Sequence, residues 1–155
     1  MYVEYYHSKI GWLKIVANYK AIIELTYVEQ KQDANPNEIT QACILQLAQY
    51  FNGSRTTFEL PLEVNGTLFQ EKVWKVVASI PYGETRSYKS VAKLCGNDKA
   101  SRAVGNANNH NPIAIIIPCH RVIGSNGKLV GYAYGTQKKQ FLLELEKEHK
   151  KFEHK

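Results

Sequence analysis

Long apolar runs are missing from this sequence. No stretch approaches the roughly 18 to 20 apolar residues that a membrane-spanning helix requires. The opening, MYVEYYHSKI, has no basic segment followed by an apolar one, which is the pattern of a secretory leader. These absences favour a soluble, cytoplasmic protein, and we expect no membrane partner.

Cysteine is scarce as well. The three cysteines, Cys43, Cys95 and Cys119, cannot all pair within one chain, and none has the CxxC spacing or the nearby histidines of a zinc site. A disulfide framework is therefore not expected, and free thiols in a reducing compartment fit better. We predict no metal.

Acidic residues are outnumbered by basic ones. The chain has 155 residues, with 20 Lys and Arg against 14 Asp and Glu, and a formal net charge of +6. Such an excess favours a polyanionic partner through phosphate attraction and counterion release. Charge alone does not distinguish a nucleic-acid-binding protein from the many basic proteins that bind none. The length allows one compact domain or two small ones.

The first part of the sequence has a strand pattern followed by a helical one. Three short strands over residues 2–6, 12–17 and 21–27, separated by tight turns, predict an antiparallel meander. Apolar residues then recur at helical spacing from Ile39 to Tyr50, until Gly53 ends the helix. Residues 54–66 look irregular and are the candidate linker. We expect an N-terminal α/β domain over residues 1–63 and a second domain over residues 64–155.

The second part is predicted to be mainly helical, which makes the whole chain an α/β (α+β) fold. One helix opens at Thr67, a short one covers residues 88–94, and another follows over about residues 99–108. The two short helices match a helix-turn-helix, and small side chains on the second would let it approach a DNA groove closely. A helical hairpin packed in a core would show the same pattern.

The rest of the second part contains a strand and a final helix. The continuous apolar run over residues 113–117 predicts a strand buried on both faces. The last helix is capped by Thr136, and the charged tail beyond Lys147 is expected to fray.

A thiol next to a histidine is the most reactive feature of the chain. Cys119 comes at the end of the predicted strand, and His120 follows it. A free cysteine is only slightly ionised at neutral pH, so a nucleophilic cysteine needs a proton acceptor close by. Neighbouring residues on a strand point to opposite faces, so contact requires a bridging water or a turn. The alternative is a buried structural thiol beside a hydrogen-bonded polar residue.

The roles of three further residues depend on where the fold places them. Glu146 on the last helix either orients His120 or is a solvated helix residue. Asn111 either orients a nearby side chain through its amide or is a turn residue before proline. Arg102 either fills the space left by an extruded base or pairs with an acid.

The sequence closely resembles the O6-alkylguanine-DNA alkyltransferase family. The family's active-site signature, P-C-H-R-V, is present at residues 118–122. The resemblance covers nearly the whole chain and extends to Ile10-Gly11, Phe69, Val73-Trp74, Ile80-Pro81-Tyr82-Gly83, the Tyr88 helix, Arg102-Ala103-Val104-Gly105, Asn111-Pro112, Gly131-Tyr132-Ala133 and Leu142-Leu143.

This resemblance implies a ribonuclease-H-like N-terminal domain and a C-terminal DNA-binding, alkyl-accepting domain. The winged-helix-like helix-turn-helix would enter the minor groove, and the damaged guanine would be rotated out of the duplex. The implied activity is DNA repair by a methyltransferase that moves the alkyl group of O6-alkylguanine, and less efficiently of O4-alkylthymine, irreversibly onto Cys119. Each molecule would act once, as a monomer without a cofactor or an obligate protein partner, on double-stranded DNA that contains the lesion.

The resemblance also implies roles for individual residues. Asn111, a water, His120 and Glu146 would form the relay that ionises Cys119. The base pocket would be lined by Tyr88, Val122, Tyr132, Ala133, Tyr134 and Asn108, with backbone groups near Cys119, Val122 and Ala133 holding the guanine edge. Arg102 would take the vacated place in the base stack, and the other DNA contacts would come from Ala100, Ser101, Ala103, Gly105, Lys89, Asn97 and Ser125.

Two positions depart from the family's usual pattern. Tyr134 stands where glycine is common, and its ring could narrow the pocket, shield the alkyl group or stack on it. Asn108 stands where some relatives carry a larger apolar residue against the base. Parts of the pattern also fit three other functions: a lesion-binding protein without repair activity, which would lack the reactive cysteine, a transcriptional regulator, and a thiol hydrolase built on Cys119 and His120.

Overall fold

The chain forms two compact units. In the computed structural model, which describes residues 1–153, the first unit comprises Met1–Val64 and Pro112–Ala114, and the second comprises Asn65–Asn111 and the chain from Ile115 onward. Within the described residues, no helix is both long and apolar enough to cross a membrane.

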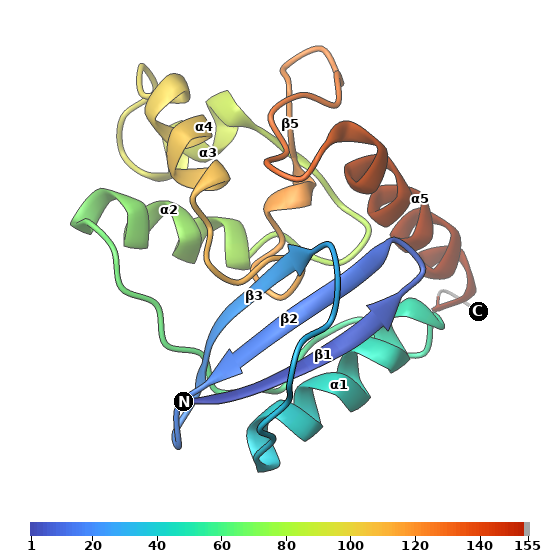
Figure 1. The fold of residues 1–155 in the computed structure, drawn as a ribbon. Helices are drawn as coiled ribbons and strands as arrows, with labels where there is room; N and C mark the ends of the chain where they lie inside the picture. Colours follow the sequence, from blue (N-terminus) through green and yellow to red (C-terminus); the bar gives the residue numbers. More distant parts are fainter. Residues whose placement is uncertain (154–155) are drawn as a thin grey trace. The chain divides into compact units, whose positions relative to one another are not determined.

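The first unit is built on a three-stranded antiparallel sheet (Figure 1). Strands β1 (Tyr2–Ser8), β2 (Gly11–Ala17) and β3 (Ile22–Val28) lie in sequence order, which confirms the predicted meander. Gly11 closes the first turn at a φ of 117°, where a side chain would be strained. The fully buried side chains of the sheet come from β2, with Leu13, Ile15 and Ala17, and from β3, with Ile22 and Leu25.

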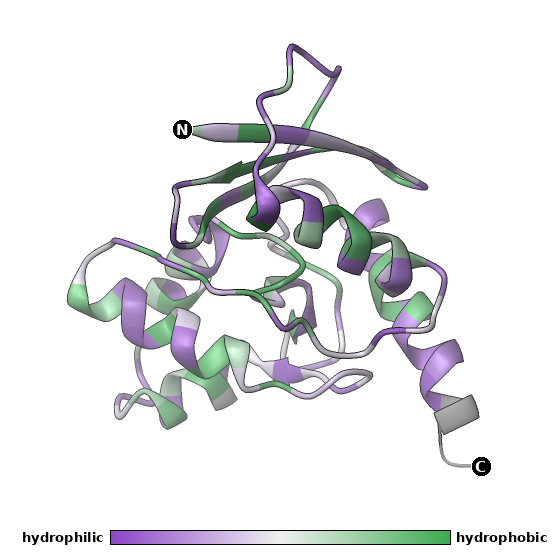
Figure 2. Ribbon diagram, turned by 90° about the horizontal axis from the view of Figure 1, so that it is seen from below, coloured by the Kyte–Doolittle hydropathy of each residue, from purple (hydrophilic) through white to green (hydrophobic). Residues whose placement is uncertain are grey.

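Helix α1 (Glu38–Phe51) packs on this sheet, as its apolar spacing predicted. Asn37 caps the helix by accepting a hydrogen bond from Thr40 N, while the Thr40 hydroxyl accepts one from Asn37 N. Hydrophobic and hydrophilic residues alternate around α1 (Figure 2), and its buried side chains are Thr40, Cys43, Leu47, Tyr50 and Phe51.

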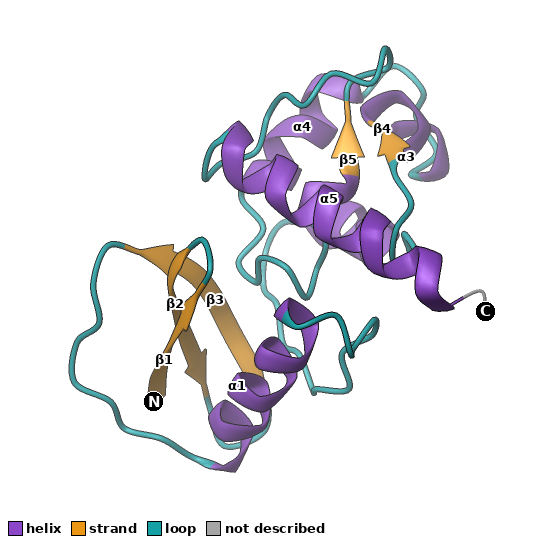
Figure 3. Ribbon diagram, turned by 90° about the vertical axis from the view of Figure 1, so that its right-hand side faces the viewer, coloured by secondary structure: helices purple, strands orange, loops and turns teal. Residues whose placement is uncertain are grey.

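The second unit is mainly helical (Figure 3). It contains α2 (Leu68–Ala78), α3 (Tyr88–Leu94), α4 (Ser101–Asn109) and α5 (Thr136–Glu153), with a short parallel pair formed by β4 (Arg86–Ser87) and β5 (Val122–Ile123). The α3 and α4 helices pack together across a tight turn and form the expected helix-turn-helix. The mixed α/β fold class is therefore confirmed.

Local capping signals explain where these helices begin. Thr67 and Gln70 form the predicted capping box at α2. The Ser87 hydroxyl accepts a hydrogen bond from Ser90 N at the start of α3. The Trp74 indole of α2 donates 2.8 Å to the Ala107 carbonyl, which fixes α4 against α2.

The apolar run from Ile113 to Ile117 is not a strand, so that prediction was wrong. The run is largely buried, but Ile113 makes only a single bridge, to Leu25, and the chain then turns with Ile115 at a φ of 70°. A positive φ is strained for a β-branched residue, so the surrounding structure must hold it there. Ile115, where the chain turns, is also where the run passes from the first unit to the second.

Helix α5 continues beyond Lys147, where fraying was expected. The Lys150 ammonium lies 3.4 Å from Glu84, and its aliphatic stem packs so closely on Gly83 that a Cβ there would lie 2.4 Å from it. Although the later turns of α5 are hydrophilic (Figure 2), these contacts extend the helix to Glu153.

Candidate active site

Cys119 lies on a one-turn 3-10 helix, η1 (Cys119–Arg121), in the second unit. The Cys119 N–H donates 2.7 Å to the Ile117 carbonyl, and the Arg121 N–H donates 2.9 Å to the Pro118 carbonyl. This turn replaces the extended geometry that would have sent neighbouring side chains to opposite faces. Cys119 is 4% exposed and His120 is fully buried.

His120 is held by Glu146 from α5. Its Nε2 lies 2.6 Å from Glu146 Oε2, and both side chains are fully buried. Burial alone would raise the pKa of Glu146, but His120 and the Arg121 guanidinium outweigh burial and hold that pKa below its usual range. The carboxylate can then only accept, so Nε2 carries the imidazole hydrogen and Nδ1 is the unprotonated nitrogen.

The other ring nitrogen of His120 is available for proton transfer. Nδ1 is buried and has no hydrogen-bond partner within the described part of the chain. Burial lowers the pKa of His120, and the nearby Glu146 only partly opposes this effect. His120 is therefore a neutral base at physiological pH.

Arg121 was not singled out from the sequence, although it belongs to the P-C-H-R-V signature. Its Nε and one terminal nitrogen donate to the two Glu146 oxygens at 2.8 and 2.9 Å, and the other terminal nitrogen donates 2.7 Å to the Ile80 carbonyl. The guanidinium also lies 5.7 Å from the centre of the Tyr82 ring. A bidentate guanidinium pair fixes both position and charge of the carboxylate that orients His120.

Asn111 places an amide beside the thiol. Its Nδ2 donates 2.8 Å to the Ile117 carbonyl, and its side chain also hydrogen-bonds the Cys119 sulfur. Burial raises the pKa of Cys119 to about 11, while Asn111 and the charge of Lys139 act against this rise. The resting group is therefore a thiol that must lose its proton before it reacts.

Lys139 of α5 is a second residue that the sequence did not indicate. Its side chain is fully buried, and its ammonium donates to the Val122 carbonyl and, at 2.7 Å, to the Val130 carbonyl. Burial lowers its pKa to about 8, and a negative charge on Cys119 acts to raise it. Lys139 thus supplies a positive charge close to the sulfur.

The loop before α5 is fastened to α3. The Tyr88 hydroxyl donates 2.8 Å to the Val130 carbonyl, the same oxygen that Lys139 binds. Gly131, at a φ of 80°, leaves room for that hydroxyl, because a Cβ there would lie 2.5 Å from it. Tyr132 is buried, Ala133 is exposed, and Tyr134 meets Tyr132 edge-on with ring centres 5.6 Å apart.

The predicted DNA contacts lie on α3, α4 and nearby turns. Arg102, near the start of α4, is exposed, as are Lys89, Asn97, Ala103 and Ser125, whereas Ala100, Ser101 and Gly105 are half-buried. Gly105 faces the Tyr88 ring, and a Cβ there would make an ordinary van der Waals contact with it at 3.8 Å. The buried members of the predicted base pocket are Val122, Tyr132 and Asn108.

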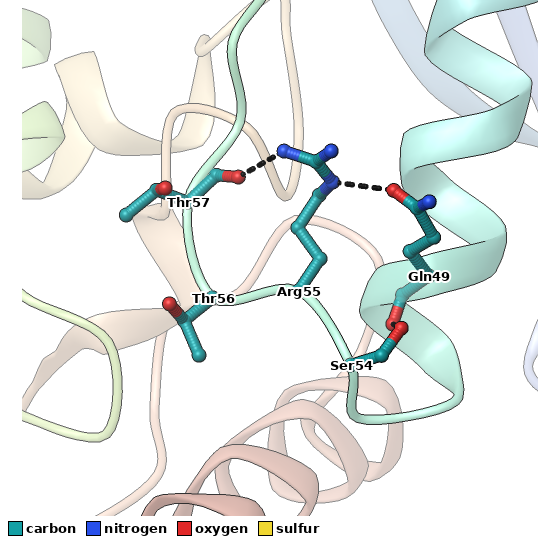
Figure 4. Close-up of a pocket in the computed structure, with 5 residues that line it drawn as sticks. All are labelled: Gln49, Ser54, Arg55, Thr56 and Thr57. Atoms are coloured by element: carbon teal, nitrogen blue, oxygen red, sulfur yellow. Dashed lines mark hydrogen bonds between the residues drawn. The ribbon is translucent and has the colours of Figure 1, made fainter. Parts of the chain in front are cut away.

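A polar hollow in the first unit contains none of these residues (Figure 4). It is lined by Gln49, Ser54, Arg55, Thr56 and Thr57. Arg55 donates 2.7 Å to the Gln49 side chain and 2.9 Å to the Thr57 carbonyl, which braces the loop after α1. No cluster of three or more His, Cys, Asp or Glu side chains able to hold a metal ion occurs within residues 1–153.

Both parts of the chain match models of known protein families. Residues 1–64 match the model of the 6-O-methylguanine DNA methyltransferase ribonuclease-like domain, and residues 68–148 match that of its DNA-binding domain. A methylated-DNA–protein-cysteine methyltransferase from Methanosarcina barkeri is 46% identical over 153 residues, covering 94% of this chain and 97% of that protein. One from Mycobacterium bovis is 47% identical over 146 residues, covering 90% and 88%.

A solved structure agrees over nearly the full length. The crystal structure of Mycobacterium tuberculosis OGT in complex with DNA has a TM-score of 0.90 and 44% identity, covering 96% of this chain and 94% of that one. The buried Cys119, the His120–Glu146 pair and the helix-turn-helix thus occur within a sequence that matches both family domains. The chain belongs to the methylated-DNA–protein-cysteine methyltransferase family.

Proposed function

We propose that the protein repairs DNA by taking the alkyl group of O6-alkylguanine irreversibly onto the sulfur of Cys119. The observation that carries this proposal is the state of His120. Glu146 fixes its Nε2–H, and its Nδ1 is left buried and unprotonated, on the residue that directly follows the protonated Cys119 thiol. A neutral base next to a thiol is the arrangement needed to create a thiolate when the substrate arrives.

The transfer is a displacement at the alkyl carbon. His120 Nδ1 takes the Cys119 proton through a water, and Asn111 and Lys139 stabilise the thiolate. A carbon–sulfur bond forms as the carbon–O6 bond breaks, and the departing guanine takes up a proton. The product is a thioether that His120 and its neighbours have no means to hydrolyse, so each molecule acts once.

Double-stranded DNA is the proposed partner. The small-sided α4 helix would enter the minor groove, Arg102 would occupy the gap in the base stack, and Tyr88 would assist rotation of the base. The exposed Lys89, Asn97 and Ser125 would contact the DNA backbone. We propose that one copy of the chain suffices and that O4-alkylthymine is a slower substrate.

Mass measurement of the intact protein tests the transfer. After incubation with a duplex that contains one O6-methylguanine, the protein should gain the mass of one methyl group, located on Cys119. Cys119→Ala should gain none, while Cys95→Ala, which removes another buried thiol, should gain one. Lesion binding without any gain of mass would identify a sensor, and regeneration of the free thiol with repeated turnover would identify a hydrolase.

The pH dependence of transfer should distinguish a relay from a thiol that ionises alone. Because the pKa of His120 lies below its usual value and that of Cys119 is about 11, the neutral histidine–thiol pair persists between these limits. Single-turnover rates at saturating protein should therefore stay constant from about pH 6.5 to 8 and fall only in more acid solution.

His120→Gln provides the matched variant for this measurement. Without the base, the rate should be lower and should rise about tenfold per pH unit, because only spontaneously ionised Cys119 reacts. A wild-type rate that rises in the same way would exclude the relay.

A further inference from the structure

The buried amide of Asn108 has one unused hydrogen-bonding atom. Asn108 is 2% exposed, near the end of α4, and its Oδ1 has no partner within the described part of the chain. An unpaired buried polar atom destabilises the fold, so its presence calls for an explanation.

The orientation of this amide is fixed by its other contacts. Nδ2 donates 3.2 Å to the carbonyl of Cys119, the proposed alkyl acceptor. A flipped amide would point Oδ1 at the Cys119 carbonyl and lose that bond. The free atom is therefore an acceptor, and it belongs to a side chain that is held by the backbone of the nucleophile.

Backbone carbonyls of the site already accept at least one hydrogen bond each, although a carbonyl oxygen can accept two. The Cys119 carbonyl receives Asn108 Nδ2, the Val122 carbonyl receives Lys139, and the Val130 carbonyl receives both Lys139 and Tyr88. These carbonyls include two, at Cys119 and Val122, that were expected to hold the guanine edge. Among these acceptors, Asn108 Oδ1 is the one without a donor in the part of the chain that the structure describes.

The chemistry of the lesion indicates which donor it would meet. Alkylation at O6 removes the N1 hydrogen of guanine, so the exocyclic 2-amino group is the only N–H donor left on the pyrimidine ring of the base. Unmodified guanine presents the same group in the minor groove. An O4-alkylated thymine has no such group.

We propose that Asn108 Oδ1 accepts a hydrogen bond from the 2-amino group of the rotated base and so makes the site selective for alkylated guanine. This rests on the proposed function, since it assumes that the base enters beside Cys119. The amide contributes twice: Nδ2 positions the Cys119 backbone, and Oδ1 reads the base. Loss of one such hydrogen bond should change the transfer rate about tenfold.

The test compares two duplexes that differ only in the 2-amino group, one with O6-methylguanine and one with O6-methylhypoxanthine. Wild-type protein should alkylate itself about tenfold faster with O6-methylguanine. Asn108→Leu, which is close in size, will be slower on both because the Cys119 carbonyl loses its donor, but its ratio of the two rates should fall toward one. Asn109→Leu, an exposed neighbour on α4, should keep the wild-type ratio.

The ratio separates recognition from a merely structural role. The energy of opening each duplex is the same for every variant, so it cancels in the comparison. An unchanged ratio in Asn108→Leu would overturn the inference, and so would equal wild-type rates on the two bases. Failure of wild-type protein to react with O6-methylguanine would instead overturn the proposed function.

Discussion

Arg121→Met should lower the free energy of unfolding by roughly 3 to 5 kcal/mol, because it leaves a buried carboxylate without its cation. Glu146 is fully buried and Arg121 is nearly so, with a side-chain exposure of 8%. The variant loses both guanidinium bonds to Glu146 and the bond to the Ile80 carbonyl. His120 alone cannot replace them, because it meets only one of the two Glu146 oxygens.

Urea unfolding at pH 7 measures this change. Arg86→Met is the matched control, because it removes the same charge from a partly exposed pair with Glu84 and should change stability little. A loss in Arg121→Met no larger than in the control would mean that the buried network does not stabilise the fold.

At acid pH, wild type and Arg121→Met should differ less in their free energy of unfolding. The folded-state pKa of Glu146 lies below its unfolded value, so the stabilisation that depends on its charge is fully present above about pH 4.3 and is lost as the pH falls toward the folded-state pKa. Urea unfolding of both proteins at pH 7 and pH 4 should therefore show that the wild type exceeds Arg121→Met in free energy of unfolding by less at pH 4 than at pH 7.

The elements with local signals could be predicted from the sequence. The capping residues Thr67 and Ser87 mark the starts of α2 and α3, and alternating apolar residues mark the strands of the first unit. Cys119 and His120 stand out because a thiol beside a base, within P-C-H-R-V, indicates a nucleophile and its proton acceptor. These features depend on neighbours within a few residues along the chain.

Other features depend on distant parts of the chain. In a basic sequence, Arg121 and Lys139 look like solvated cations. They can be buried because Glu146 and backbone carbonyls from distant parts of the chain bind them. Residues 113–117 have the composition of a strand, yet they turn at Ile115, where the run passes from one unit to the other. Local periodicity contains no information about such partners.

Lys139→Met should reduce the rate of alkyl transfer about 10- to 100-fold, the effect of losing one charge-assisted hydrogen bond at the reacting site. Its ammonium acts in two ways at once. It holds the Val122 and Val130 carbonyls, and it places a positive charge near the sulfur that must become a thiolate. Methionine has a similar length but can do neither.

The stability of Lys139→Met should not fall as its transfer rate does. Burial lowers the pKa of Lys139 to about 8, which means that the fold disfavours its charged form relative to the unfolded chain below that pH. Removing a buried charge relieves this cost, although the two carbonyls lose their donor. Lys139→Met should therefore lose much more of its transfer rate than of its stability, which is the pattern of a residue kept for function.

Single-turnover transfer at different pH values tests the electrostatic part of this role. The ratio of wild-type to Lys139→Met rates should be largest below about pH 8 and should shrink above it, where Lys139 loses its charge in the wild type. Lys147→Met, which removes an exposed cation from the same helix, should transfer at the wild-type rate throughout. A wild-type rate in Lys139→Met at pH 7 would show that Cys119 needs no cation beyond its hydrogen bonds, and the thiolate would then rest on His120 and Asn111 alone.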